Sequence, residues 1–310
     1  MTPAVAGESG HERWSESTAM GTTVQLCLVG EEPDDVRADQ AGELHALVAE
    51  VDAALSRFRA DSDVGRLNAA PGRWLPVGPH LVAVARAAVR YRELTGGVFN
   101  PVSGGSGLEL RARSGDGWQA RLGPGGSLDL GAIAKGYAAD LVRDRATASG
   151  VLVSLGTSSI SVAGWPLVRD RWRIAVSSPW EPLTETLGYL EVGRGSFSVS
   201  GLRGQRIRAG EVVAGHVRDP RTGTWARTDV CAAGVLSEDG MLSEALSTAC
   251  LVLGLERGMG LAEQLGVAAL FLTVDGRALG SPRLASLFSL RAGVGARLRE
   301  LREQAGLPVR

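Results

Sequence analysis

One lysine stands out among the residues of this chain that could do chemistry. Of the 33 Lys and Arg residues in the 310-residue sequence, Lys135 is the only lysine. It lies in the stretch LDLGAIAKGYAAD at 128–140, which predicts a strand, a tight glycine turn and the start of a helix. Such a junction leaves backbone N–H groups unpaired beside a partial positive charge, so it can bind a phosphate.

The spacing around Lys135 matches neither common nucleotide-binding pattern. It lacks both the Walker sequence G-x-x-x-x-G-K-[ST] and the dinucleotide sequence G-x-G-x-x-G. A general preference for arginine, with Lys135 left here by chance, is the alternative explanation. The residues alone therefore predict an anion site and no particular ligand.

Four more residues have side chains suited to catalysis or metal binding. Glu244 and Thr248 are four apart on one face of a predicted helix. Their structural alternative is an exposed glutamate and a threonine bonded to its own helix turn. His216 and Asp219 lie in HVRDPRTG, where a lone histidine is more often a hydrogen-bonded structural residue and Asp-Pro forms turns.

Composition narrows the class of protein. Hydrophobic residues make up 44% of the sequence and charged residues 22%, as in a globular domain that buries a core. The formal net charge of −1 and the 5% aromatic content disfavour nucleic acid as a partner. Cys27, Cys231 and Cys250 have no C-x-x-C spacing and lie among apolar residues, which predicts buried thiols.

We expect neither a targeting segment nor a membrane span. The first residues lack a basic leader followed by an apolar core, and they carry no cysteine that could take a lipid. The longest apolar run, near 246–255, is too short to cross a membrane. A cytoplasmic location is therefore predicted.

Apolar spacing predicts an α+β fold with most strands in the middle of the chain. We expect a loose tail at 1–17 and a single domain at 18–310. The predicted helices are 38–59, 81–94, 242–255, one near Leu261 and one near Arg297, and the predicted strands are 22–29, 150–156, 160–162, 171–178, 187–192, 196–201, 229–236 and 267–274. Residues 61–68 are expected to form a polar turn, and 98–126 a loop with a short hairpin.

Seven motifs occur in an order that resembles the FAD:protein FMN transferase family, the ApbE-type flavin transferases. The resemblance extends from residue 18 to about residue 275. Its motifs are MGT (20–22), SRFRADSDVGRLN (56–68), GGVFNP (96–101), LDLGAIAKGYAAD (128–140), SLG (154–156), HVRDPRTG (216–223) and SEALSTACLVLG (243–254).

The resemblance implies both an architecture and a reaction. The architecture is a T-fold-related α+β fold, with antiparallel sheets and packed helices, that binds FAD with Mg²⁺. The enzyme would transfer FMN from FAD to a threonine of an acceptor flavoprotein and release AMP. Phosphoryl transfer of this kind depends mainly on positioning and charge neutralisation.

The same resemblance assigns roles to particular residues. The metal would bind the main-chain carbonyl of Ala132 and the side chains of Glu244 and Thr248. His216 would accept the threonine proton or hold the phosphate, and Asp219 would orient the loop or the base. Flavin contacts would come from Met20, Phe58, Val98, Phe99, Asn100, Lys135 and the backbone of Arg218, although Phe58 and Phe99 could equally be core residues.

The chain departs from the family's pattern at four places. Glu244 replaces the usual aspartate, and its extra methylene moves the carboxylate by more than about an ångström, which a small octahedral ion tolerates poorly. Asn100 followed by Pro101 and Val102 replaces Asp-Pro-Thr, the segment up to Ser127 is shortened, and SGLRG at 200–204 replaces S-G-D-Y. Two alternatives therefore stay open: a non-catalytic FAD-binding protein of the same fold, and an FAD pyrophosphatase that yields FMN and AMP.

Overall fold

The computed structural model describes residues 11–113, 115, 117–180, 186–202, 217–226 and 228–306. These residues form both helices and antiparallel sheets, so the α+β prediction is confirmed. In chain order the elements are β1 (Glu12–Ala19), β2 (Thr22–Val29), α1 (Asp34–Leu55), α2 (Asp63–Ala69), β3 (Leu75–Val77), α3 (Pro79–Leu94), β4 (Val102–Ser103), β5 (Leu108–Ala112), β6 (Trp118–Leu122), β7 (Ser127–Leu128), α4 (Ala134–Arg145), β8 (Gly150–Leu155), β9 (Ser159–Gly164), β10 (Trp172–Ser177), β11 (Thr186–Val192), β12 (Gly195–Gly201), β13 (Val230–Ser237), α5 (Gly240–Leu253), α6 (Leu255–Leu265), β14 (Ala268–Thr273), β15 (Ala278–Gly280), the 3-10 helix η1 (Pro282–Leu284), β16 (Phe288–Leu290) and α7 (Val294–Gln304).

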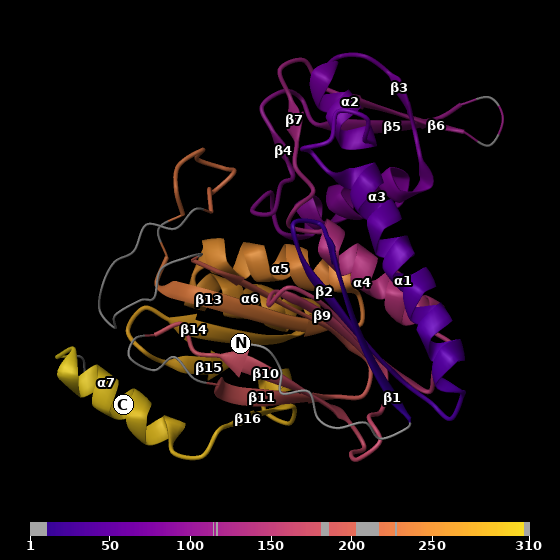
Figure 1. Ribbon diagram of the computed structural model, residues 1–310. Helices are drawn as coiled ribbons and strands as arrows, with labels where there is room; N and C mark the ends of the chain where they lie inside the picture. The colour runs from indigo at the N-terminus through magenta and orange to yellow at the C-terminus, as the bar shows by residue number, and fades with distance from the viewer. Residues whose placement is uncertain are drawn as a thin grey trace.

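An eight-stranded antiparallel sheet, which we call the main sheet, runs through the centre of the molecule (Figure 1). Its strand order is β1-β2-β8-β9-β12-β13-β14-β15. β14 is buried at every position and β13 at all but its last. Such continuous burial means that other layers cover both faces of this part of the sheet.

Helices cover one face of the main sheet and a small sheet covers the other (Figure 1). α4 packs on β8 and β9, α5 on β12 and β13, and α6 on β14. On the opposite face the sheet β10-β11-β16 contributes Trp172 and Leu190 to a buried cluster that also holds Phe197 of the main sheet. The first turns of α4 and α5 are thereby held beside the main sheet.

A second, smaller part of the molecule lies beyond the helical face (Figure 1). It contains the sheet β3-β6-β5, the pair β4-β7, and the helices α2 and α3. Its core is continuous with that of the helices, because Leu67, Leu122 and Leu128 belong to the same buried cluster as Ile133 of the α4 turn. Lys135, in the first turn of α4, therefore lies close to the place where the two parts join.

Two sequence predictions about local structure were wrong. Residues 12–17, expected in a loose tail, form most of β1, an edge strand whose half-exposed side chains show little apolar alternation. Residues 63–69, expected in a polar turn, form α2, in which the Ser62 side chain accepts the N–H of Gly65. Seven residues with two buried apolar side chains are too few for spacing alone to reveal a helix.

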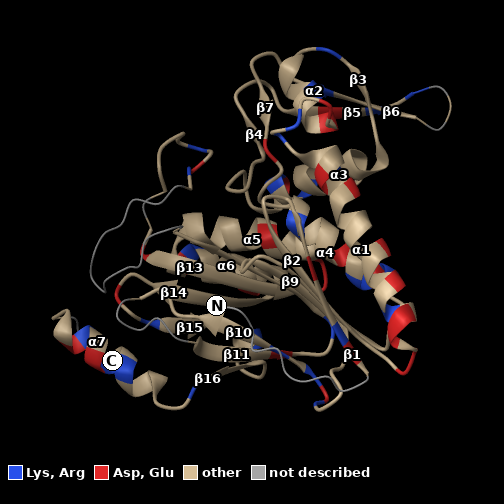
Figure 2. Ribbon diagram, viewed as in Figure 1, with Lys and Arg blue, Asp and Glu red and all other residues tan. Residues whose placement is uncertain are grey.

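The charged residues are spread over the fold. Figure 2 shows acidic and basic residues mixed along α1, α3 and the loops of the described chain. This mixture agrees with the formal net charge of −1. Within the described residues, no helix combines the length and the apolar character needed to cross a membrane.

Candidate functional site

The turn that leads into α4 is held by side-chain and backbone hydrogen bonds. The Asn68 amide donates to the carbonyl of Leu128 and accepts its N–H, at 2.9 and 2.7 Å. The N–H groups of Ile133 and Ala134 both donate to the carbonyl of Leu130. The predicted strand, turn and helix start are therefore confirmed. Asn68 holds the strand end of the turn, and the Leu130 carbonyl holds its helix end.

Lys135 lies one residue into α4 and its side chain is largely buried, at 13% exposure. Its ammonium donates to the Ser158 hydroxyl, and its Nζ lies 3.7 Å from Oε1 of Glu244. Ser158 comes from the loop between β8 and β9, whereas Glu244 comes from α5. Three separate segments thus meet at this lysine.

Glu244 is buried and makes hydrogen bonds with both carboxylate oxygens. Its Oε2 accepts the N–H of Gly136 at 3.0 Å, and its Oε1 accepts the hydroxyl of Ser159. Burial raises the pKa of Glu244 above its usual value, while the Lys135 ammonium and these hydrogen bonds oppose that shift. A buried carboxylate is stable only with such partners.

The anion at the start of α4 is therefore a side chain of the protein itself. The sequence predicted N–H groups available to a phosphate at this helix N-terminus, but the N–H of Gly136 donates to Glu244. The Lys135 ammonium donates to the Ser158 hydroxyl and lies 3.7 Å from Oε1 of the same carboxylate. An incoming phosphate would contact the lysine side chain rather than the Gly136 N–H.

The other proposed metal ligands lie near the same helices. Thr248 follows Glu244 by one turn of α5, and its hydroxyl hydrogen-bonds to that of Ser200 at 3.0 Å. Ala132 lies, half-buried, in the turn before α4. The described residues contain no group of three or more His, Cys, Asp or Glu side chains arranged for a metal ion.

These donors suit magnesium in type but not in arrangement. Carboxylate, hydroxyl and carbonyl oxygens are the hard ligands that Mg²⁺ takes. Each oxygen of the Glu244 carboxylate already accepts a hydrogen bond, Oε2 from Gly136 and Oε1 from Ser159, beside the Lys135 ammonium. A buried ammonium 3.7 Å from the carboxylate also repels a second cation there. The residues therefore do not fit magnesium as they stand, and Glu244 as a metal ligand stays a prediction.

Of the two proposed catalytic residues, the structure describes one. His216 lies outside the described residues. Asp219 forms a tight turn in which its carboxylate accepts the backbone N–H and the guanidinium of Arg221. The Arg221 side chain holds the pKa of Asp219 below its usual value. The turn-forming alternative for Asp219 is thus observed, and a catalytic role stays a prediction.

The predicted flavin contacts differ in how exposed they are. Met20 has a φ of 54° in the turn between β1 and β2 and packs partly into the core. Phe58 is 84% exposed and stacks against the Arg57 guanidinium, so the core alternative is wrong for it. The guanidinium of Arg218 likewise lies over the ring of Trp225, at 4.7 Å. Both arginine–aromatic pairs have exposed rings, since Trp225 is 49% exposed.

The side chains of the turn at 98–100 mostly face inwards. Val98 and Phe99 are 3% and 2% exposed and belong to the main core cluster, so the core alternative is confirmed for Phe99. The Asn100 side chain accepts the N–H of Val102. A flavin contact from Val98 or Phe99 would have to use the backbone.

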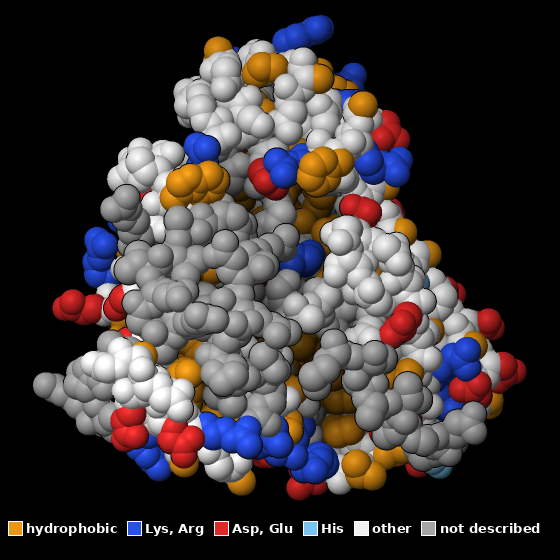
Figure 3. All heavy atoms as spheres, turned by 60° about the vertical axis from the view of Figure 1, so that its left-hand side comes forward, with side chains coloured by type: hydrophobic (Ala, Val, Ile, Leu, Met, Phe, Trp, Pro, Cys, Tyr) orange, Lys and Arg blue, Asp and Glu red, His pale blue; other side chains and the backbone are white. Residues whose placement is uncertain are grey.

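Sequence reasoning missed several polar residues of this site. Ser158 and Ser159 contact Lys135 and Glu244, and Ser200 contacts Thr248. The run of hydroxyl residues directly after the SLG motif is the signal that could have revealed the first two. The space-filling view in Figure 3 shows hydrophobic and basic side chains recessed between the upper part of the molecule and the part below it.

The fold and the site define an α+β protein with a buried lysine–glutamate pair where the first turns of α4 and α5 meet the main sheet. Residues 20–108 and 106–271 match the family model of the ApbE family, and the chain belongs to this family. The ApbE resemblance drawn from the motifs is thereby confirmed.

Named relatives agree with this assignment. A FAD:protein FMN transferase of Treponema pallidum is 29% identical over 292 residues, which cover 78% of this chain and 81% of the relative. The FAD:protein FMN transferase of Vibrio cholerae is 28% identical over 292 residues, covering 83% and 86%. The apo crystal structure of the Pseudomonas stutzeri flavinyl transferase ApbE has a TM-score of 0.74 at 25% identity, covering 91% of this chain and 99% of that one.

Proposed function

We propose that this protein transfers FMN from FAD to a threonine hydroxyl of an acceptor flavoprotein and releases AMP. Membership of the ApbE family and the names of the relatives support this activity. The structural observation that carries the proposal is the Lys135 ammonium, which is held by Ser158 at the junction of three segments. A lysine is a compact point charge suited to a phosphate oxygen.

The reaction balances as a single displacement at phosphorus. The acceptor oxygen forms a bond to the phosphorus on the FMN side of the pyrophosphate, and the bond from that phosphorus to the bridging oxygen breaks. AMP leaves with the electron pair, and the hydroxyl proton passes to a base. Lys135 would neutralise charge that develops on the phosphate oxygens, which is the main contribution a protein makes to such a reaction.

Roles for the remaining residues follow from the resemblance and belong to this proposal. His216 would accept the proton, and Asp219 would hold the turn from which the neighbouring Arg218 backbone faces FAD. Phe58 and Met20 would contact the flavin. At 84% exposure, Phe58 is accessible to such a ligand.

Magnesium is the part of the proposal that the described residues support least. It would supply charge neutralisation at the pyrophosphate, bound through the Ala132 carbonyl, Glu244 and Thr248. Since the Glu244 carboxylate is engaged by Gly136, Ser159 and Lys135, we assign no step to the ion. Its effect is left to the assay.

The test is a product analysis with and without an acceptor. Purified protein is incubated with FAD and a flavoprotein domain that carries an acceptor threonine, in parallel with magnesium and with a chelator. The proposal predicts AMP in equal amount to flavinylated acceptor, and no AMP when the threonine is replaced by alanine.

Two other outcomes of this assay would support the two alternative functions. Free FMN and AMP without an acceptor would identify an FAD pyrophosphatase. FAD that binds and stays intact would identify a non-catalytic FAD-binding protein. Either result contradicts the proposed transfer.

A further inference from the structure

The first turns of α4 and α5 carry the same short pattern. α4 contains Gly136 and, four residues later, Asp140, while α5 begins with Gly240 and has Glu244 four residues later. A spacing of four places the glycine and the carboxylate on one face of each helix. Each helix therefore presents a bare backbone and an acid to its neighbour.

The two glycines let the helix backbones touch. A Cβ atom on Gly136 would lie closer than 3.0 Å to the carbonyl carbon and oxygen of Gly240. A Cβ atom on Gly240 would lie 2.7 Å from the carbonyl oxygen of Gly136. Since neither backbone can move without shifting its helix, alanine fits at neither position.

The carboxylates complete a reciprocal pair of hydrogen bonds. The N–H of Gly136 donates to Oε2 of Glu244 at 3.0 Å, and the N–H of Gly240 donates to Oδ2 of Asp140 at 2.6 Å. Both N–H groups belong to first helical turns, which lack partners inside their own helix. Each acid thus caps the other helix at its positive end.

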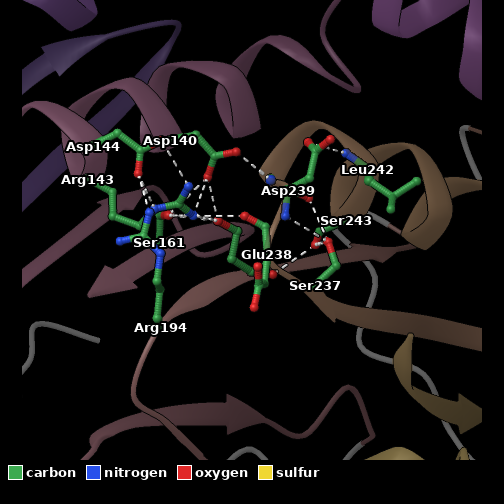
Figure 4. Close-up of polar contacts among 12 residues, drawn as sticks. Asp140, Arg143, Asp144, Ser161, Arg194, Ser237, Glu238, Asp239, Leu242 and Ser243 are labelled. Atoms are coloured by element: carbon green, nitrogen blue, oxygen red, sulfur yellow. Dashed lines mark hydrogen bonds and ion pairs between the residues drawn. The ribbon is translucent and has the colours of Figure 1, made fainter. Parts of the chain in front are cut away.

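One strand of the main sheet holds both acids. Ser159 and Ser161 are two apart on β9 and so face the same side of the sheet. Ser159 donates to Glu244, and Ser161 donates to Asp140 at 3.2 Å. Asp140 also accepts from Arg143 and Ser196. Figure 4 shows Asp140 and Arg143 within this polar cluster.

We propose that Asp140 and Glu244 form a reciprocal clasp between α4 and α5, and that this clasp, rather than a metal ion on Glu244, fixes Lys135 in the candidate site. Lys135 directly precedes the clasped Gly136, so any slip between the helices moves its ammonium. A buried carboxylate at Glu244 and a largely buried one at Asp140 are a poor source of stability compared with apolar packing. Their presence here is consistent with a role in fixing one arrangement of α4 against α5. The consequence for Lys135 rests on the proposed function.

Backbone hydrogen exchange tests the clasp without any need for activity. Exchange of the Gly136 and Gly240 amides is followed by NMR in Asp140→Asn and Glu244→Asp, with Asp39→Asn on the exposed side of α1 as the matched control. We expect about tenfold faster exchange of Gly240 in Asp140→Asn and of Gly136 in Glu244→Asp. Unchanged exchange at both glycines would overturn the clasp.

Glu244→Asp also separates the clasp from a metal site. Magnesium alone is titrated by calorimetry into the unaltered protein and the variant. The clasp predicts that Glu244→Asp binds magnesium no more tightly than the unaltered protein. The shorter side chain cannot reach Gly136, and it does not become a metal ligand. Tighter binding together with unchanged Gly136 exchange would show that Glu244 is a displaced metal ligand. If Glu244→Asp does not fold, Ser159→Ala serves instead, with the same expected rise in Gly136 exchange.

Transfer kinetics test the consequence for Lys135. Asp140→Asn should lower kcat for FMN transfer by about tenfold while KM for FAD changes by less than about twofold. A kcat per folded molecule that equals that of the unaltered protein would show that the clasp does not position the lysine. If the unaltered protein transfers no FMN, the proposed function fails, whereas the exchange result still decides the clasp.

Discussion

Lys135 and Glu244 need each other because both are largely buried. Their side chains are 13% and 6% exposed, and each keeps few contacts with water. Burial disfavours the charged form of Glu244 and raises its pKa, and Lys135 is the largest influence in the opposite direction. Lys135 is the only lysine in the chain, and its pairing with a buried carboxylate is hard to reconcile with a lysine left at this position by chance.

This pairing predicts how substitutions combine. Lys135→Met should lower the free energy of unfolding by about 3 kcal/mol, because it leaves a buried carboxylate without its cation. Adding Glu244→Gln should recover about 1–2 kcal/mol, since the neutral amide still accepts from Gly136 and no longer needs the ammonium. Urea unfolding of the single and double variants measures both quantities. A double variant no more stable than Lys135→Met would contradict the pairing.

At the scale of elements, the close approach of α4 and α5 decides the geometry of the site. Gly136 and Gly240 are required by contact and not by an unusual φ, since neither has a positive φ angle. Not every helix glycine is constrained in this way. Gly42 on the exposed side of α1 has no atom within 4 Å of the position that a Cβ would take.

The two kinds of glycine should respond oppositely to alanine. Gly136→Ala should lower the free energy of unfolding by about 1–3 kcal/mol, because its methyl group meets the Gly240 carbonyl. Gly42→Ala, the matched control, should raise it by about 0.5–1 kcal/mol through the better helix propensity of alanine. Denaturant unfolding of both variants provides the comparison. Equal effects at the two sites would mean that the helices do not touch at Gly136.

The elements also show what sequence patterns can and cannot predict. The long helix α1 followed from apolar spacing, because it buries one continuous stripe. α5 was also predicted as a helix, although it is buried on most of its sides. β1 and α2 were not predicted, since one is a polar edge strand and the other a helix of only seven residues. Of the residues that the motifs singled out, the structure brings Lys135 and Glu244 together.

The partners within the site could not be read from the sequence. Gly136 and Glu244 are 108 residues apart, and only the packing of α4 on α5 brings them together. Local spacing suggested free N–H groups at the α4 turn, and the tertiary contact supplied an acid to one of them. The exposure of Phe58 was equally invisible, because an aromatic residue after an amphipathic helix usually packs inward.

For the whole molecule, the layered core accounts for the state of the cysteines. Cys27 and Cys231 lie between the main sheet and the β10-β11-β16 sheet, and Cys250 lies in the cluster formed by α5, α6 and the main sheet. All three are free and buried. Burial raises the pKa of each thiol to about 12.

The native protein should therefore resist thiol reagents. Its three cysteines are protonated and buried, so none of them should react with a thiol reagent near neutral pH. The cysteines of the unfolded protein should react fully in the same time. Ellman's reagent, added with and without denaturant, measures this. Rapid reaction of any cysteine in the native protein would contradict the core described above.

Attachment of FMN to an acceptor changes the intact mass of that acceptor. The protein is mixed with FAD and a threonine-bearing flavoprotein domain, and the mass of the acceptor is measured by mass spectrometry. We expect a mass increase of one FMN less one water, absent with Lys135→Met. An acceptor of unchanged mass, in the presence of bound FAD and with or without magnesium, would contradict the proposed transfer.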